Sequence, residues 1–193
     1  MAKVLVRVNT PVYGRGVIER LTKSDWIAHG LRTLAGDGVA GLKVGSMATG
    51  LQVSRGSFYW HFEDIADFRS QLLKSWQERT TDQVIRELET EAEPERLKQL
   101  LTRAFDARPT VDRAIRSWAA EDEAVAAIVA SVDARRIAYI ADLIVAAGVE
   151  RQRASRRATF LYWAWLGQTI VMDPSHASLA DVEMDDICEL FES

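Results

Sequence analysis

Cysteine, proline and histidine are all scarce in this chain, whose 193 residues include one cysteine, four prolines and three histidines. The single cysteine, Cys188, excludes a disulfide within the chain and fits a reducing compartment. Packing in the core of a helical domain is its simplest role. No stretch approaches the roughly 20 consecutive apolar residues that span a bilayer, and the N-terminal residues lack the apolar core of a signal peptide. We therefore expect a cytoplasmic protein with no membrane partner.

Catalytic patterns are lacking as well. The histidines, His29, His61 and His176, lie far apart in the sequence. There is no glycine-rich phosphate loop, no Cys/His set with metal-ligand spacing and no nucleophile motif. We predict no metal, no cofactor and no enzymatic activity, and an enzyme built on these helices is the least favoured alternative.

The composition indicates a helical globular protein with an uneven charge. Hydrophobic residues make up 48% of the chain, and runs of β-branched residues are few. Residues 1–62 hold eight Lys or Arg against three Asp or Glu, a net of +5, and the remainder holds sixteen against twenty-five, a net of −9. A basic N-terminal third on an acidic remainder suits a DNA-reading unit on a body that DNA repels, although charge alone does not decide this.

The stretch 42–62 reads as two short helices joined at an angle. Apolar residues in the first follow the i, i+3, i+4, i+7 spacing of one buried stripe: Val44, Met47, Ala48 and Leu51. The second begins at Ser54, whose hydroxyl is placed to cap the first turn, and Val53 can pack on Phe58 as a hydrophobic staple. Two helices joined by a tight turn form a helix-turn-helix, in which the second helix reads base edges.

The outer face of the second helix carries side chains that suit a nucleic-acid surface. They are Arg55, Ser57, Tyr59, Trp60 and His61. A guanidinium can bond guanine in the major groove, and hydroxyls and phenols reach phosphates. Gly56 would let the backbone approach a phosphate closely.

The run Val-Ser-Arg-Gly-Ser-Phe-Tyr-Trp-His-Phe over 53–62 resembles the recognition-helix signature of TetR-type (TetR/AcrR) transcriptional regulators, and the resemblance extends over residues 20–75. It implies an all-α fold of about nine helices: a flexible arm at 1–19, a helix-turn-helix head at 20–66 and a helical effector-binding and dimerisation body at 67–193. It also implies a homodimer that binds a palindromic DNA operator, most simply as a repressor, and that responds to an unidentified apolar or aromatic effector. The DNA-binding residues that we predict are Lys43, Ser46, Ser54, Arg55, Gly56, Ser57, Tyr59, Trp60 and His61, with Arg55 and Ser57 nearest the bases.

Three positions depart from the family pattern. Lys43 stands where a capping threonine is usual, Gln52 stands in the turn where glycine is usual, and Ile65 replaces the lysine that usually begins the fourth helix. A positive φ at Gln52 would cost on the order of 1 kcal/mol. These departures leave open the main alternative, a dimeric ligand-binding or partner-binding protein of the same fold that does not read an operator.

Apolar periodicity and turn residues place the remaining helices. We expect one from Thr22, with Asp25 completing a capping-box-like pair, to the glycines at 36–38, and a long one capped by Asp64 that runs to about Leu88 and links head and body. Further helices are expected at about 94–105, 110–118, 122–148 and 154–172, and a last one from Ser178.

The helix at 154–172 is apolar on two sides, so it must be covered on two sides. We assign one stripe, with the last helix, to a homodimer interface formed by Leu161, Tyr162, Trp165, Leu179, Val182 and Ile187; the alternative is that this helix is central to its own domain. We assign other aromatic residues to an effector pocket formed by Phe105, Trp118, Tyr139, Phe160 and Trp163. For any single aromatic among these, ordinary core packing is the better expectation.

Overall fold

The computed structural model describes residues 21–106, 110–168 and 184–192, and within these ranges every regular element is helical. The all-α prediction is confirmed. The predicted arm at 1–19 lies outside the described residues.

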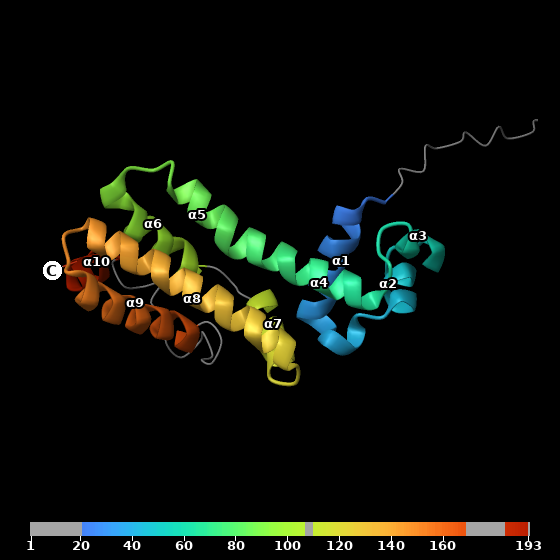
Figure 1. Ribbon diagram of the computed structural model, residues 1–193. Coiled ribbons are helices and arrows are strands. Elements are labelled where there is room, and N and C mark those ends of the chain that lie inside the picture. The colour runs from blue at the N-terminus through green and yellow to red at the C-terminus, as the bar shows by residue number, and fades with distance from the viewer. Residues whose placement is uncertain (1–20, 107–109, 169–183, 193) are drawn as a thin grey trace, which may run out of the picture.

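The head is a three-helix unit, and a capping box fixes the start of its first helix. Helix α1, Lys23–Asp37, begins at Thr22, where the Asp25 amide donates to the Thr22 hydroxyl over 3.2 Å and the Thr22 amide donates to the Asp25 carboxylate over 2.7 Å. This reciprocal capping box was predicted. A short 3₁₀ turn at Val39–Gly41 leads to α2, Val44–Gly50, and α3, Arg55–Tyr59 (Figure 1).

Head and body are joined by one continuous helical rod. It consists of α4, Ile65–Gln77, a π-helical segment, Glu78–Asp82, and α5, Gln83–Leu88. Asp64 caps its start by accepting from the Asp67 amide over 2.8 Å. The rod ends where the sequence predicted, whereas the π segment was not predicted. Helix α1 crosses the rod closely at Gly30, because a Cβ there would lie 2.5 Å from a ring carbon of Phe68.

The body packs its helices beside the second half of this rod (Figure 1). They are α6, Glu93–Asp106; α7, Thr110–Ala119; α8, Glu123–Ala146; α9, Arg151–Leu166; and α10, Met184–Glu192. Helices α8 and α9 are joined by a short turn and lie side by side, with α10 at the end of the molecule away from the head. With the rod counted once and the short 3₁₀ turn left out, the described residues form nine helices, as predicted.

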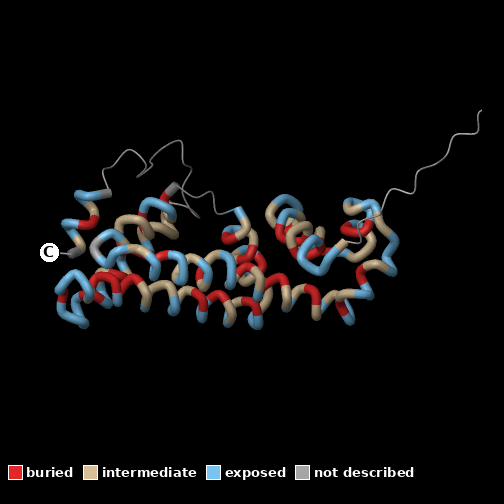
Figure 2. Tube along the Cα trace, turned by 90° about the horizontal axis from the view of Figure 1, so that it is seen from above, coloured by how far each residue is buried: buried red, intermediate tan, exposed pale blue. Residues whose placement is uncertain are grey.

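Two clusters of buried side chains hold the molecule together. The first contains the head residues Trp26 and Phe58 and continues through Phe68 and Trp76 on the rod to α7 and the beginning of α8. The second joins α6, the end of α8, α9 and α10, where Cys188 is buried as expected. Figure 2 shows these buried positions recurring along the rod and inside the head. The first cluster therefore crosses the predicted domain boundary at residue 66.

Candidate nucleic-acid interface and effector cavity

The turn between α2 and α3 sets the angle of the predicted helix-turn-helix. Gln52 lies in this turn with a φ of +57°, the left-handed conformation that glycine adopts without strain. The chain returns into α3 through a hydrogen bond from the Val53 amide to the Ala48 carbonyl, 3.0 Å long. The turn thus keeps the backbone shape that glycine usually provides, with a strained glutamine in its place.

We expect Gln52→Gly to raise the free energy of unfolding by about 0.5–1 kcal/mol. The left-handed conformation costs a non-glycine residue about 1–2 kcal/mol, and the extra freedom of glycine in the unfolded chain returns part of that gain. Urea unfolding of the two proteins measures the difference. A destabilised Gln52→Gly protein would show that the glutamine side chain makes a stabilising contact larger than its strain.

The N-terminus of α2 and the outer side of α3 form one exposed surface. Lys43, Ser46, Ser54, Arg55 and Gly56 are all exposed on it. A Cβ on Gly45 would lie 2.8 Å from a terminal nitrogen of Arg55, so the guanidinium lies directly against α2. The lack of a side chain at residue 45 allows this approach, which the sequence analysis missed.

Two predictions about caps in the head are settled. Lys43 begins α2 without a side-chain hydrogen bond, as expected for a residue that cannot cap. Ser54 also makes no side-chain bond to α3, so its predicted capping role is wrong. The first turn of α3 is closed instead by the Ser57 amide, which donates to the Ser54 carbonyl over 3.0 Å.

Helix α3 is shorter than predicted, and its last two candidate residues lie just beyond it. Tyr59 ends the helix with 59% of its surface exposed, and Trp60 follows with 81% exposed. Ser57 is half-buried. His61 folds back, and its Nε2 donates to the carbonyl of Leu21 over 2.9 Å. His61 thereby ties the end of α3 to the start of α1, and its contact with DNA stays a prediction.

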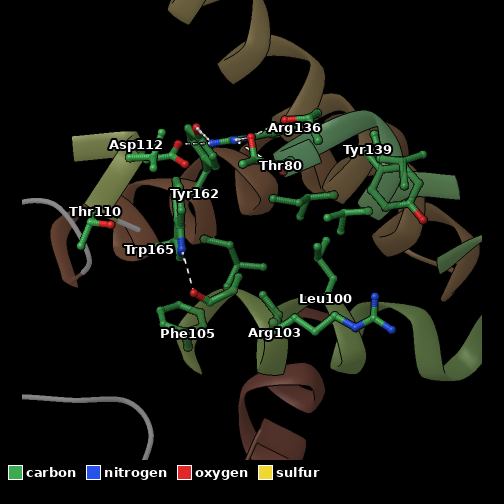
Figure 3. Close-up of a pocket in the computed structure, with 18 residues that line it drawn as sticks. Thr80, Leu100, Arg103, Phe105, Thr110, Asp112, Arg136, Tyr139, Tyr162 and Trp165 are labelled. Carbon is green, nitrogen blue, oxygen red and sulfur yellow. Dashed lines mark hydrogen bonds and ion pairs between the residues drawn. The ribbon is translucent and has the colours of Figure 1, made fainter. Parts of the chain in front are cut away.

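The body contains a cavity of about 380 Å³ between the rod, α6, α7, α8 and α9 (Figure 3). Phe105 and Tyr139 line it, as predicted. The other three predicted pocket residues do not. Trp118 is buried in the first core cluster, while Phe160 and Trp163 are 60% and 64% exposed on the outer side of α9.

The stripe of α9 that the sequence assigns to a dimer interface faces the interior of the body instead. Leu161, Tyr162 and Trp165, predicted at a dimer interface, line the cavity. The Trp165 indole donates to the Ala104 carbonyl over 3.0 Å, which fixes it against α6. Ile187 is half-buried against the second core cluster, and Leu179 and Val182 lie outside the described residues.

One end of the cavity is polar and centres on Arg136 of α8. Its guanidinium donates to the hydroxyls of Thr81 and Thr80 in the π segment, over 2.9 and 2.8 Å, and to the carboxylate of Asp112 on α7, over 2.9 Å. It lies between the indole rings of Trp76 and Trp165, 5.5 and 5.4 Å from their centres. Figure 3 shows this network closing one end of the cavity.

Both charges of the polar end are buried. The side chains of Arg136 and Asp112 are only 12% and 7% exposed. Burial by itself lowers the pKa of Arg136, but the attraction and hydrogen bonds of Asp112 and Tyr162 together outweigh it, so the pKa lies above its ordinary value. Asp112 also accepts from the indole of Trp76 over 3.2 Å.

Tyr162 connects this pair to a second ion pair. Its hydroxyl donates to Asp133 over 2.6 Å and accepts from Arg116 over 3.0 Å, and Arg116 in turn bonds both carboxylate oxygens of Asp133. Burial raises the pKa of Tyr162 to about 12, so the phenol is neutral at physiological pH. The polar end is therefore a neutral, hydrogen-bonded wall shared by the rod, α7, α8 and α9.

The sequence holds a signal for this buried pair that the sequence analysis did not use. Arg136 stands on the apolar stripe of α8, four residues after Val132 and four before Ile140. Asp112 stands three residues before the buried Ile115. A lone charge of each sign on two otherwise apolar stripes predicts a buried ion pair.

The described parts of the chain contain no cluster of three or more His, Cys, Asp or Glu able to hold a metal ion. Among the helices described, none has the length and apolar character needed to cross a membrane.

No protein-family model matches the chain, and no curated protein matches its sequence. Solved structures do match. One is the crystal structure of a protein from Rhodococcus sp. described as a TetR-family transcriptional regulator, with 19% identity and a TM-score of 0.57. The match covers 88% of this chain and 94% of the Rhodococcus chain. The chain therefore has the fold of a TetR-family transcriptional regulator.

Proposed function

We propose that the protein is a DNA-binding transcriptional regulator of the TetR family whose operator affinity responds to a small molecule. The observation that carries the proposal is the exposed surface of the head, where Arg55 of α3 lies against the N-terminus of α2 and Lys43, Tyr59 and Trp60 stand in solvent. Arginine, lysine and tyrosine there can bond base edges and phosphates. Tyr59 and Trp60, two large aromatic side chains exposed at adjacent positions, favour a binding face.

The proposed regulator acts in the cytoplasm on a palindromic operator, most simply as a repressor. A two-fold dimer on a palindrome places both recognition helices in successive major grooves. Occupancy of such a site is by itself enough to exclude other proteins from the same DNA. Activation would need an additional contact with another protein.

The outer side of α9 and α10 is the surface that we propose for the homodimer. Phe160, Trp163 and Leu190 are 60%, 64% and 67% exposed there, and the ring of Phe160 stacks on Phe191 at 6.1 Å. The sequence analysis assigned the interface to the same two helices. On α9, however, the exposed aromatic residues are Phe160 and Trp163. Pairing of this face with its two-fold copy would bury it in a four-helix arrangement.

Ligand response is proposed to run through the rod. The same helix carries head-packing residues such as Phe68 and cavity-lining residues such as Thr80, Thr81 and Ile85. Its π segment is held from the cavity side by Arg136. Because π segments are rare and frequently mark functional sites, an effector that disturbs this contact would shift α4 and change the spacing of the two heads.

We expect Arg55→Ala to relax base preference at one position of each half-site, by about 1–3 kcal/mol. Lys43→Ala, which removes a proposed phosphate contact, should weaken binding to all DNA sequences uniformly. It should also reduce the slope of the logarithm of affinity against the logarithm of salt concentration by about one. Arg86→Ala removes the same kind of charge from α5, far from the head, and serves as the control. Titration of each protein against operator variants at several salt concentrations measures these effects.

If Arg55→Ala lowers the affinity equally for all operator variants, Arg55 contacts a phosphate and not a base. Weak binding by the unaltered protein, without sequence preference, would instead support the alternative of a ligand-binding or partner-binding protein that keeps this fold. The positive φ at Gln52 shows that the turn keeps its shape despite the departure from the family pattern.

A further inference from the structure

The lining of the cavity is mostly apolar, and apart from Arg103, Thr110 and Tyr139 its polar side chains gather at the end formed by Arg136, Asp112, Tyr162 and the π segment. Aliphatic and aromatic side chains from α5, α6, α8 and α9 make up most of its surface. A ligand in it would exchange water for apolar contacts over most of its own surface. The polar end therefore decides whether the ligand can carry a charge.

All five N–H groups of Arg136 are already directed at acceptors. The Nε group donates to Thr81, one terminal nitrogen donates to Asp112 and, at 3.5 Å, to the oxygen of Tyr162, and the other donates to the hydroxyl of Thr80 and, at 3.5 Å, to its carbonyl. An arginine has no further donors. A carboxylate or sulfonate could bond Arg136 only by displacing an existing partner.

The charge of Arg136 is neutralised as well. One oxygen of Asp112 accepts from Arg136, and the other accepts from the indole of Trp76. The hydroxyl of the neighbouring Tyr162 donates a hydrogen bond to Asp133. An anion entering the cavity would meet a wall without net charge and would lose its hydration without compensation.

Resting on the effector cavity of the proposed function, we propose that this cavity binds uncharged apolar molecules and excludes their anionic counterparts. The cavity selects uncharged molecules because Arg136 is already paired with Asp112 when no ligand is bound. The pair positions the π segment and presents a neutral surface to the ligand.

Arg103 is a further cation among the cavity-lining residues that the structure describes, and it lies at the rim. Its side chain is 45% exposed, and its guanidinium donates to Glu87 over 3.1 Å. Its charge is therefore shared with solvent and with a carboxylate outside the cavity. It does not offset the charge of a ligand inside.

A pair of probes with the same ring system tests the proposal. N-phenylnaphthylamine is uncharged, and anilinonaphthalene sulfonate adds one sulfonate to the same scaffold. Isothermal titration calorimetry of the full-length protein should give one site per protomer for the uncharged probe. The sulfonate should bind at least about tenfold more weakly. Ala104→Trp, which places an indole in the cavity, should remove the binding of the uncharged probe.

The Asp112→Asn protein tests whether the pairing of Arg136 is the cause of the difference in affinity between the two probes. It leaves Arg136 as an unneutralised cation facing the cavity, so the affinity ratio between the two probes should fall at least about fivefold. Asp142→Asn is the matched control, because Asp142 also pairs with an arginine and lies on α8, but on the exposed surface. Thermal melting followed by circular dichroism verifies that each variant is folded.

The outcomes distinguish the two levels of the proposal. Failure of the uncharged probe to bind would contradict the effector cavity itself. Equal or tighter binding of the sulfonate to the unaltered protein would overturn the selectivity and leave the cavity standing. An unchanged ratio in folded Asp112→Asn would show that the closed ion pair is not its source.

Discussion

Replacing Arg136 by methionine will lower the free energy of unfolding by about 3–5 kcal/mol, because it leaves the carboxylate of Asp112 buried without its cation. The change also removes the donors that hold Thr80 and Thr81 in the π segment. Methionine fills much of the same volume between Trp76 and Trp165, so loss of packing contributes little. Urea unfolding at neutral pH measures the difference.

Two further variants test whether the loss of stability comes from the buried charge pair. Arg151→Met removes an arginine from an exposed ion pair, since the side chains of Arg151 and its partner Asp142 are 63% and 59% exposed, and should cost less than about 1 kcal/mol. The double variant Arg136→Met with Asp112→Asn removes both charges and keeps an acceptor for the Trp76 indole. It should recover more than half of the loss. A loss below about 1 kcal/mol for Arg136→Met alone would mean that the pair is solvated in solution.

Trp163→Glu is expected to convert the proposed dimer into a monomer at micromolar concentration. Trp163 is 64% exposed on the outer side of α9, and two-fold pairing of that side would place a carboxylate of each protomer in an apolar interface. Central tryptophans commonly contribute 2 kcal/mol or more to an interface, which is a loss of affinity of about thirtyfold or more. Sedimentation velocity over a concentration series measures the shift.

The control for this result is an exposed tryptophan elsewhere. Trp60→Glu alters a residue that is 81% exposed in the head and should leave the dimer intact. The Trp163→Glu monomer should keep its helical content and lose operator affinity, since one head meets only one half-site. A Trp163→Glu protein that still sediments as a dimer would place the interface on another surface.

The head was largely predictable because its signals are local. The Thr22–Asp25 box and the cap at Asp64 depend on residues three apart, and both caps form as expected. The positive φ of Gln52 follows from the tight turn that the two helices require. Prediction failed at Ser54, whose hydroxyl makes no capping bond to α3, and at the end of α3, which stops at Tyr59 and leaves Trp60 and His61 beyond it.

The cavity was not predictable to the same degree, because it depends on contacts between distant helices. The two stripes of α9 are visible in the sequence, but periodicity does not say which of them faces the same protomer. Trp165 faces inward because the Ala104 carbonyl on α6 accepts its indole proton, a contact across 61 residues. The π segment likewise depends on Arg136, which lies more than 50 residues further along the chain.

Selection of bound sequences from a random duplex DNA pool by the purified protein, at near-physiological salt, tests the central claim most directly. Two exposed recognition surfaces on a two-fold dimer predict enrichment of a palindrome whose half-sites lie about one helical turn apart. The same selection with Arg55→Ala should return a palindrome degenerate at one position of each half-site. A well-folded protein that enriches no sequence would contradict operator reading and support a ligand-binding or partner-binding role for this fold.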